Sequence, residues 1–172
     1  MTVKMRPIPF YIFISLILCL LVQGCSQEEE YNKQSAPNFT LQDLSGKEVS
    51  LIQHKGQIVL LDFWATWCAP CRRSIPELVE IQEKYRDQGL VVLGISADDP
   101  RRVSVKSLLA FKEQYKINYS ILRGDNQVRM SYFGNGQMPI PTLFVIDREG
   151  RVVDSIVGYV PGAVERSLSK LL

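Results

Sequence analysis

Short apolar runs alternate with longer stretches of mixed character from residue 58 to the C-terminus. The runs are rich in β-branched and aromatic residues and are bounded by turn-forming residues, a pattern typical of buried strands. The predicted strands are, in chain order, 58–64, 90–95, 119–122, 142–146 and 152–157, with a turn at 147–150 between the last two.

Helices are predicted between these strands and after the last one. Apolar residues recur at helical spacing from Pro70 to about Asp87, and Pro76 is expected to kink this helix. Residues 101–115 and 161–171 predict two further helices. Strands that alternate with helices and end in an antiparallel pair predict an α/β fold with a mixed central sheet flanked by helices.

The N-terminal part of the chain divides into three segments. Residues 39–41 and 48–51 flank turn-forming residues and predict a β-hairpin. Residues 25–35 are polar and lack apolar periodicity, which predicts a flexible tether ahead of one domain at 36–172. Residues 1–24 contain an apolar core that is short for a membrane span and typical of a signal peptide.

Cys25 follows Gly24 directly after this apolar core, as at a lipoprotein processing site, where the cysteine is lipidated and becomes the new N-terminus. The alternative is an uncleaved signal anchor. Both interpretations place the domain outside the cytoplasm. Ser26 after the cysteine favours the outer membrane in a cell that has one.

The formal charge of the chain is +2, which is the contribution of Lys4 and Arg6 in the leader. The rest of the chain is therefore formally neutral. Because a nucleic-acid surface needs a basic excess on one face, we expect no nucleic-acid partner.

The candidate chemistry lies where the strand 58–64 leads into the first helix. Cys68 and Cys71 are separated by two residues on the first helical turn, so they can close a disulfide. The free N–H groups and the dipole at the helix N-terminus favour a thiolate at Cys68, the candidate nucleophile. Cys71 is expected to be more buried and is the candidate resolving thiol. Pro70 suits the first helical positions, where its missing N–H costs nothing.

The alternative for this pair is half of a zinc site, which needs two more Cys or His ligands. The other cysteines, Cys19 and Cys25, lie near the N-terminus, and the single histidine, His54, stands alone in a polar loop. We therefore expect a redox-active Cys68–Cys71 disulfide, with no metal and no other cofactor.

Residues 62–71, with the sequence Asp-Phe-Trp-Ala-Thr-Trp-Cys-Ala-Pro-Cys, are similar to the active-site segment of thioredoxin, with Ala69 where thioredoxin has glycine. Residues 140–142 (Ile-Pro-Thr) resemble the cis-proline loop of that family. From about Ser35 onward, and with its leader, the chain resembles the membrane-tethered TlpA/ResA-like thiol-disulfide oxidoreductases of the bacterial envelope. The resemblance implies a thioredoxin-like fold with an N-terminal hairpin and, between Asp98 and Pro141, a central strand-and-helix insertion that is a specificity surface.

The resemblance also implies a docking surface. It places a cis peptide bond at Ile140–Pro141 and implies that Ile140, Pro141 and Thr142 bind the extended chain of a partner by strand addition. Trp67, next to Cys68, is expected on the same surface.

Asp62 lies within an apolar run and aligns with the buried aspartate of thioredoxin, which implies proton transfer at Cys71. Burial raises a carboxyl pKa, which suits that role. The alternative is a solvated aspartate at a strand edge. The companion lysine of thioredoxin aligns with Gly94. Asp98 lies near the position of a glutamate in ResA-like relatives, with an ordinary loop aspartate as the alternative.

The family implies protein disulfides as substrates, with apocytochrome c as the leading candidate, an inner-membrane thiol transporter as electron donor, and a monomer. The lack of the Pro-His pair of strongly oxidising relatives favours a reductase. Two other classes stay open. A peroxiredoxin-like peroxidase is indicated by residues 92–98, but it needs a threonine where Ala65 stands. A Sco-like copper-binding module needs a longer cysteine spacing and a distal histidine.

Overall fold

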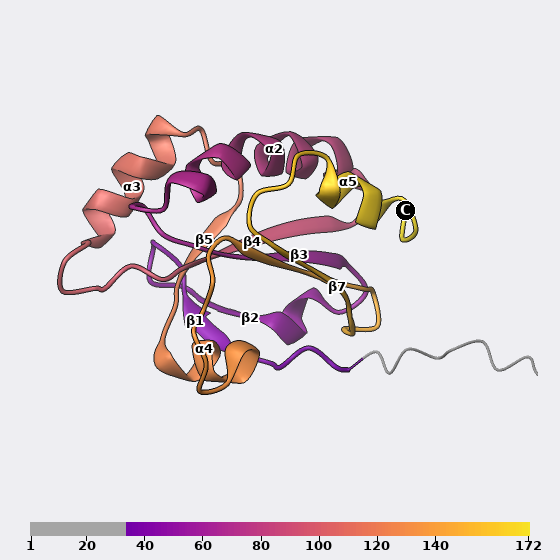
Figure 1. Ribbon diagram of the computed structural model, residues 1–172, viewed down its shortest axis with the longest axis horizontal. Helices are drawn as coiled ribbons and strands as arrows, with labels where there is room; N and C mark the ends of the chain where they lie inside the picture. Colours follow the sequence, from indigo (N-terminus) through magenta and orange to yellow (C-terminus); the bar gives the residue numbers. More distant parts are fainter. Residues whose placement is uncertain (1–33) are drawn as a thin grey trace, which may run out of the picture. The chain divides into compact units, whose positions relative to one another are not determined.

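The computed structural model describes residues 34–172 (Figure 1). The predicted signal peptide, the lipidation site Cys25 and residues 25–33 of the predicted tether lie outside the described residues. The elements are, in chain order, β1 (Thr40–Gln42), β2 (Glu48–Ser50), η1 (Leu51–His54), β3 (Ile58–Trp64), α2 (Ala69–Tyr85), η2 (Arg86–Gln88), β4 (Leu90–Ser96), α3 (Val105–Gln114), β5 (Ser120–Arg123), α4 (Asn126–Phe133), β6 (Thr142–Ile146), β7 (Val152–Val157) and α5 (Ala163–Leu168).

A five-stranded sheet in the order β5-β4-β3-β6-β7 forms the centre of the fold. Strands β3, β4 and β5 run parallel, whereas β6 pairs antiparallel with both β3 and β7. The predicted mixed sheet and thioredoxin-like α/β class are confirmed. All seven residues of β3 are buried, as expected of a continuous apolar run in the middle of a covered sheet.

Side chains of β3 alternate between two apolar clusters, because successive residues of a strand point to opposite faces. One face packs against α2, α3 and α5, and the other against the hairpin, η1 and α4 (Figure 1). The first cluster includes Leu60, Trp64, Ile75, Leu78, Leu108 and Leu168. The second includes Phe39, Leu41, Leu61, Phe63 and Val128. The second face is thus covered by the N-terminal hairpin and two short helices, η1 and α4.

The helices differ from the prediction more than the strands do. Helix α3 begins four residues after the predicted start at 101, because Ser104 caps it by accepting a hydrogen bond from the amide of Ser107. Helix α5 is shorter at both ends than the predicted 161–171. Helix α4 was not predicted; in its eight residues Val128 is buried, and Tyr132 and Phe133 at its end pack against Phe63. Pro76 lies inside α2, which continues past it to Tyr85.

The N-terminal hairpin and the residues before it are tied to the sheet. Asp43 forms the predicted turn by accepting hydrogen bonds from the amides of Ser45 and Lys47. Upstream, the amide of Val152 donates to the carbonyl of Gln34 at 3.0 Å. Residue 35 forms a bridge with residue 151. Residues 34 and 35 are therefore bound to the edge strand of the sheet.

Candidate active site

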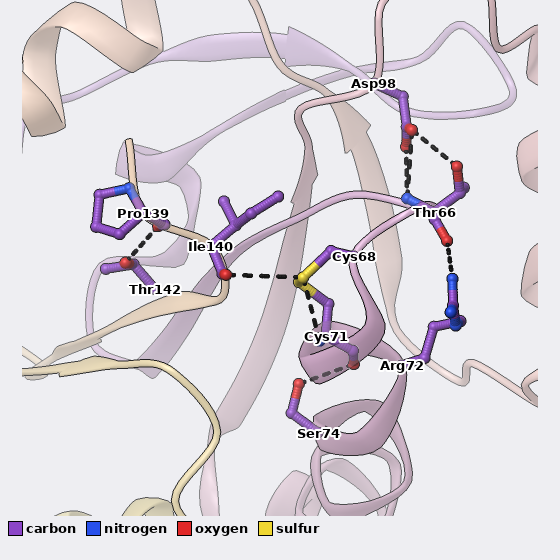
Figure 2. Close-up of a disulfide and its surroundings, with 9 residues drawn as sticks. All are labelled: Thr66, Cys68, Cys71, Arg72, Ser74, Asp98, Pro139, Ile140 and Thr142. Atoms are coloured by element: carbon purple, nitrogen blue, oxygen red, sulfur yellow. Dashed lines mark hydrogen bonds between the residues drawn. A yellow bond between two sulfur atoms is a disulfide. The ribbon is translucent and has the colours of Figure 1, made fainter. Parts of the chain in front are cut away.

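Cys68 and Cys71 form a disulfide at the N-terminus of α2, with their sulfur atoms 2.03 Å apart (Figure 2). Cys68 is the N-cap of the helix, and Ala69 and Pro70 are its first two residues. The amide of Cys71 donates to Sγ of Cys68 at 3.2 Å. Cys71 is fully buried, whereas Cys68 is 4% exposed. The same amide and the helix dipole would stabilise a thiolate at Cys68 when the disulfide is open.

The loop before β6 lies against this disulfide. The Ile140–Pro141 peptide bond is cis. The carbonyl oxygen of Ile140 lies 3.7 Å from Sγ of Cys68 (Figure 2). Thr142 is buried and its hydroxyl donates to the carbonyl of Pro139 at 2.7 Å. Of the three residues predicted to bind a partner, only Ile140 keeps part of its surface accessible, and the Thr142 side chain supports the loop from inside.

The two tryptophans near the cysteines have separate environments. Trp64 is fully buried and stacks on Phe111 with ring centroids 5.1 Å apart. Trp67 is 66% exposed directly beside Cys68, as expected for a residue of a docking surface.

Asp62 is buried in the central strand, on the face that packs against α2. The alternative of a solvated aspartate at a strand edge is therefore wrong. Its Oδ2 has no hydrogen-bond partner, and desolvation raises its pKa to about 7. A cavity of about 20 Å³, which Asp62 lines together with Ser74, Glu77 and Tyr159 among others, lies beside it and has room for about one water.

Gly94 lies opposite Asp62 in the β3–β4 register. A Cβ atom at Gly94 would lie 2.9 Å from Nε1 of Trp64 and 3.2 Å from Cε2 of Tyr119. These two side chains fill the space into which a longer side chain at this position would extend. The hydroxyl of Tyr119 and Nε1 of Trp64 are also buried without partners. Burial and, second, the charge of Asp62 raise the pKa of Tyr119.

Asp98 is buried and bound to the segment that precedes Cys68. Its carboxylate accepts hydrogen bonds from the amide of Thr66 at 3.1 and 3.2 Å, and from the Thr66 hydroxyl at 2.8 Å. Nη1 of Arg72 donates to the carbonyl of Thr66 at 2.8 Å (Figure 2). Asp98 is therefore not an ordinary loop aspartate. Thr66 and Arg72 were not predicted as site residues.

A larger cavity, of about 400 Å³, opens beside Asp98 at the carboxyl ends of β3, β4 and β5. Its lining combines apolar residues, among them Phe63, Ile95 and Met138, with several charged ones, and it includes residues of the predicted insertion. The charged lining residues are Asp98, Asp99, Arg101, Asp125 and Arg129.

His54 belongs to η1, ahead of β3, whereas the cysteines follow β3. Its Nδ1 lies 2.9 Å from Oε1 of Gln57. Because β3 spans roughly 20 Å, His54 and the cysteine pair lie at opposite ends of the strand. Residues 34–172 contain no group of three His, Cys, Asp or Glu side chains arranged to hold a metal. None of the helices in this part of the chain is long and apolar enough to cross a membrane.

Residues 33–155, which include the cysteine pair and the cis-proline loop, match the model of the AhpC/TSA family. The chain is 34% identical over 162 residues to a thiol-disulfide oxidoreductase ResA of Bacillus cereus, covering 90% of each chain. It is 34% identical over 153 residues to the thioredoxin-like protein YneN of Bacillus subtilis, covering 84% of this chain and 87% of YneN. Among solved structures, a thiol:disulfide interchange protein of the thioredoxin family from Chlorobium tepidum TLS superposes with a TM-score of 0.71 at 28% identity, covering 81% of this chain and 96% of that chain.

Proposed function

Because the chain belongs to the AhpC/TSA family and is a thiol-disulfide oxidoreductase of the ResA type with a thioredoxin-like fold, we propose that it reduces disulfide bonds of extracytoplasmic proteins. The observation that carries this proposal is the Cys68–Cys71 disulfide, which caps α2 beside the Ile140 carbonyl. In this proposal the disulfide is the only redox centre, and no further cofactor takes part.

The reaction begins with both cysteines reduced. The Cys68 thiolate attacks one sulfur of a client disulfide, forms a mixed disulfide and expels the other client sulfur as a thiolate. Cys71 then loses its proton and attacks Sγ of Cys68, which releases the second client thiol and closes the Cys68–Cys71 disulfide. Two electrons pass to the client, and an external dithiol must supply them again before the next cycle.

Asp62 is the proposed acceptor of the Cys71 proton. Support comes from its burial on the same side of the sheet as Cys71 and from a pKa of about 7, which lets the carboxylate hold and release a proton near neutral pH. The 20 Å³ cavity beside it gives room for a water that carries the proton onward.

The client is proposed to dock across the disulfide in an extended conformation. The Ile140 backbone is the pairing edge, and the exposed Trp67 ring provides apolar contact. The 400 Å³ cavity beside Asp98 supports a role of the insertion in client selection, because Asn126, Val128 and Arg129 of α4 line it.

The proposed setting is the bacterial envelope. The leader 1–24 is cleaved, Cys25 is lipidated, and the domain is held as a monomer at a membrane, the outer one where two are present. Apocytochrome c is the proposed client, and an inner-membrane thiol transporter is the proposed electron donor. The ResA name of the relatives supports the oxidoreductase chemistry of this assignment.

The two alternative functions find less support. In peroxidases of the peroxiredoxin type, a threonine stands three residues before the reactive cysteine. The corresponding residue of this chain is Ala65, which has no hydroxyl. The hydroxyl of the neighbouring Thr66 donates to Asp98. A Sco-like copper site needs a histidine near the cysteines, but His54 lies at the other end of β3. Peroxide consumption without an added thiol system, or copper retained through purification, would support these classes.

Two single substitutions test the proposed function. We expect Cys68→Ser to abolish reduction of an insulin disulfide, because the attacking sulfur is gone. Cys71→Ser should accumulate mixed disulfides through Cys68, because the resolving thiol is missing; trapping in cells followed by mass spectrometry then identifies the clients. Insulin reduction by the Cys68→Ser protein at the wild-type rate would contradict the assignment.

A further inference from the structure

We propose that Asp98 is a positioning residue, which holds Thr66 and through it keeps the Cys68 thiolate in place while the disulfide is open. This inference rests on the proposed role of Cys68 as nucleophile. It concerns a side chain two residues after the end of β4, 32 residues beyond Thr66 in the chain.

Every polar group of Thr66 is bound in the structure. Its amide and hydroxyl both donate to the Asp98 carboxylate, and its carbonyl accepts from Arg72 (Figure 2). Asp98 is itself fixed, because the Ser96 hydroxyl donates to its Oδ2 at 3.0 Å. The carboxylate therefore joins the carboxyl end of β4 to the turn that follows β3.

Thr66 lies inside the turn that carries Cys68. The amide of Cys68 donates to the carbonyl of Ala65 at 3.1 Å, and the amide of Arg72 donates to the carbonyl of Cys68 at 3.1 Å. A displacement of Thr66 is thus transmitted directly to Cys68. In the oxidised protein the sulfur–sulfur bond holds Cys68 against α2, but this restraint disappears on reduction. In the reduced protein, the contacts of Thr66 with Asp98 and Arg72 then keep Cys68 in position.

The reduced Cys68 has two geometric requirements. Its sulfur must stay within hydrogen-bond distance of the Cys71 amide, now 3.2 Å away, because this bond stabilises the thiolate. It must also stay beside the Ile140 carbonyl to meet a docked client disulfide in line. A loosened turn should therefore raise the thiolate pKa and slow the attack together.

Asp98 has a second effect, with the opposite sign. A negative charge near Cys68 disfavours the thiolate, so loss of the charge alone would lower the Cys68 pKa. The other ionisable groups around the turn are Asp62 on β3 and Cys71, Arg72 and Arg73 on α2. Farther out, the cavity beside Asp98 carries Asp99, Arg101, Asp125 and Arg129. The two effects of Asp98 are separable, because an asparagine keeps the acceptor oxygen and removes the charge.

The experiment measures the Cys68 thiolate pKa by ultraviolet absorbance of the thiolate, and its rate of mixed-disulfide formation, in a Cys71→Ser background. Asp98→Ala should raise the pKa by about one unit and slow the attack about tenfold. Asp98→Asn should keep the rate close to that of the Cys71→Ser parent, because the amide oxygen replaces Oδ1 and the Ser96 hydroxyl can accept from the amide nitrogen. Its Cys68 pKa should fall slightly below that of the parent, because the charge is gone. Thr66→Val, which removes only the hydroxyl bond, should give a smaller change in the direction of Asp98→Ala.

Glu113→Ala is the control, because it removes a carboxylate that is bound to Lys116 and neither contacts Thr66 nor lines the cavity beside Asp98. It should leave both quantities unchanged. If the Cys68 pKa fell equally in Asp98→Ala and Asp98→Asn, Asp98 would act through its charge and not by positioning Cys68, and the proposal would be wrong. A lower melting temperature with unchanged pKa and rate would make Asp98 purely structural. Should Asp98→Ala fail to fold, Thr66→Val decides by the same criterion. Failure of the Cys71→Ser parent to form mixed disulfides would instead contradict the proposed function.

Discussion

Burial and charge conflict most directly at Asp62. A charged carboxylate without a partner in the centre of a sheet is costly. The pKa of about 7 keeps the Asp62 carboxyl protonated and uncharged below neutral pH, which avoids this cost. The space over Gly94 is filled by the buried side chains of Trp64 and Tyr119, and neither carries a positive charge. Desolvation is accordingly the cause of the raised pKa.

Asp62→Asn tests the proton-transfer role. Because asparagine keeps the shape but cannot ionise, mixed-disulfide formation through Cys68 should be normal, while resolution by Cys71 should be slowed about 10- to 100-fold. Stopped-flow measurement of both steps against pH checks this prediction. Resolution at the wild-type rate with an unchanged pH profile would mean that the Cys71 proton leaves by another route.

The same substitution makes a prediction about stability. The carboxyl of Asp62 has a pKa near 4 in the unfolded chain but about 7 in the folded protein. Between these pH values the unfolded chain releases this proton more readily, so the free energy of unfolding of the wild-type protein should fall as the pH rises. Asp62→Asn should therefore stabilise the oxidised protein by about 2 to 3 kcal/mol more at pH 8 than at pH 5. Denaturant titrations at both pH values measure the difference, with Asp87→Asn, an exposed carboxyl, as control. An equal effect at both pH values would show that Asp62 does not hold its proton near neutrality.

Single residues differ in how far the sequence reveals them. Asp62 is foreseen as buried because it interrupts an apolar run, and Cys68 and Cys71 because of their spacing. The contact between Asp98 and Thr66 leaves no local pattern, since it depends on two parallel strands ending at the same edge of the sheet. Likewise, nothing in the sequence indicates that the Thr142 hydroxyl turns inward to Pro139.

At the scale of elements, Gln82 shows how α2 is joined to the sheet. Strand β5 pairs with β4 only from Leu93 onward, which leaves Leu90 to Val92 without a neighbouring strand on that side. The buried side chain of Gln82 on α2 supplies the missing hydrogen bonds. Its Oε1 accepts from the amide of Val92 at 2.7 Å, and its Nε2 donates to the carbonyl of Leu90 at 3.3 Å. One side chain thus satisfies two backbone groups of β4.

Gln82→Leu should destabilise the protein by about 2 to 4 kcal/mol, because a side chain of similar size leaves a buried amide and a buried carbonyl without partners. Gln114→Leu, at the exposed end of α3, is the matched control and should change stability by less than about 0.5 kcal/mol. Urea unfolding of the two variants gives both values. A loss below about 1 kcal/mol for Gln82→Leu would mean that water reaches these groups.

Elements that build the core were predicted more closely than those that cover it. Strands β3, β6 and β7 match the predicted ranges because nearly continuous apolar runs end at clear turn residues. Helix α4 escaped prediction because it is only eight residues long and its apolar contacts, Val128 and the Tyr132–Phe133 pair, do not repeat at helical spacing over several turns. The start of α3 is set by the Ser104 cap, a local hydrogen bond that apolar periodicity does not report.

At the scale of the whole molecule, the redox site and the proposed membrane attachment belong to separate parts of the chain. The cysteine pair, Asp62, Asp98 and the cis-proline loop all lie within residues 34–172, at or behind the edge of the sheet where β3 and β4 end. The predicted lipid attachment at Cys25 precedes this domain. In our proposal the attachment depends on the leader and Cys25.

Cys25→Ser should therefore separate the two functions. A serine cannot form the thioether that carries the lipid, so the protein should move from the membrane fraction to the soluble fraction, or accumulate as an uncleaved precursor. The purified domain should still reduce insulin at the wild-type rate, because Cys25 lies outside the domain that holds the redox site. Cys68→Ser should behave in the opposite way, remaining in the membrane fraction without activity. Fractionation combined with mass spectrometry of the N-terminus checks both variants. If the wild-type protein keeps Met1 and the Cys25→Ser variant stays in the membrane fraction, a signal anchor and not a lipid holds the protein. Loss of insulin reduction in a folded Cys25→Ser domain would show that the two functions are not separable.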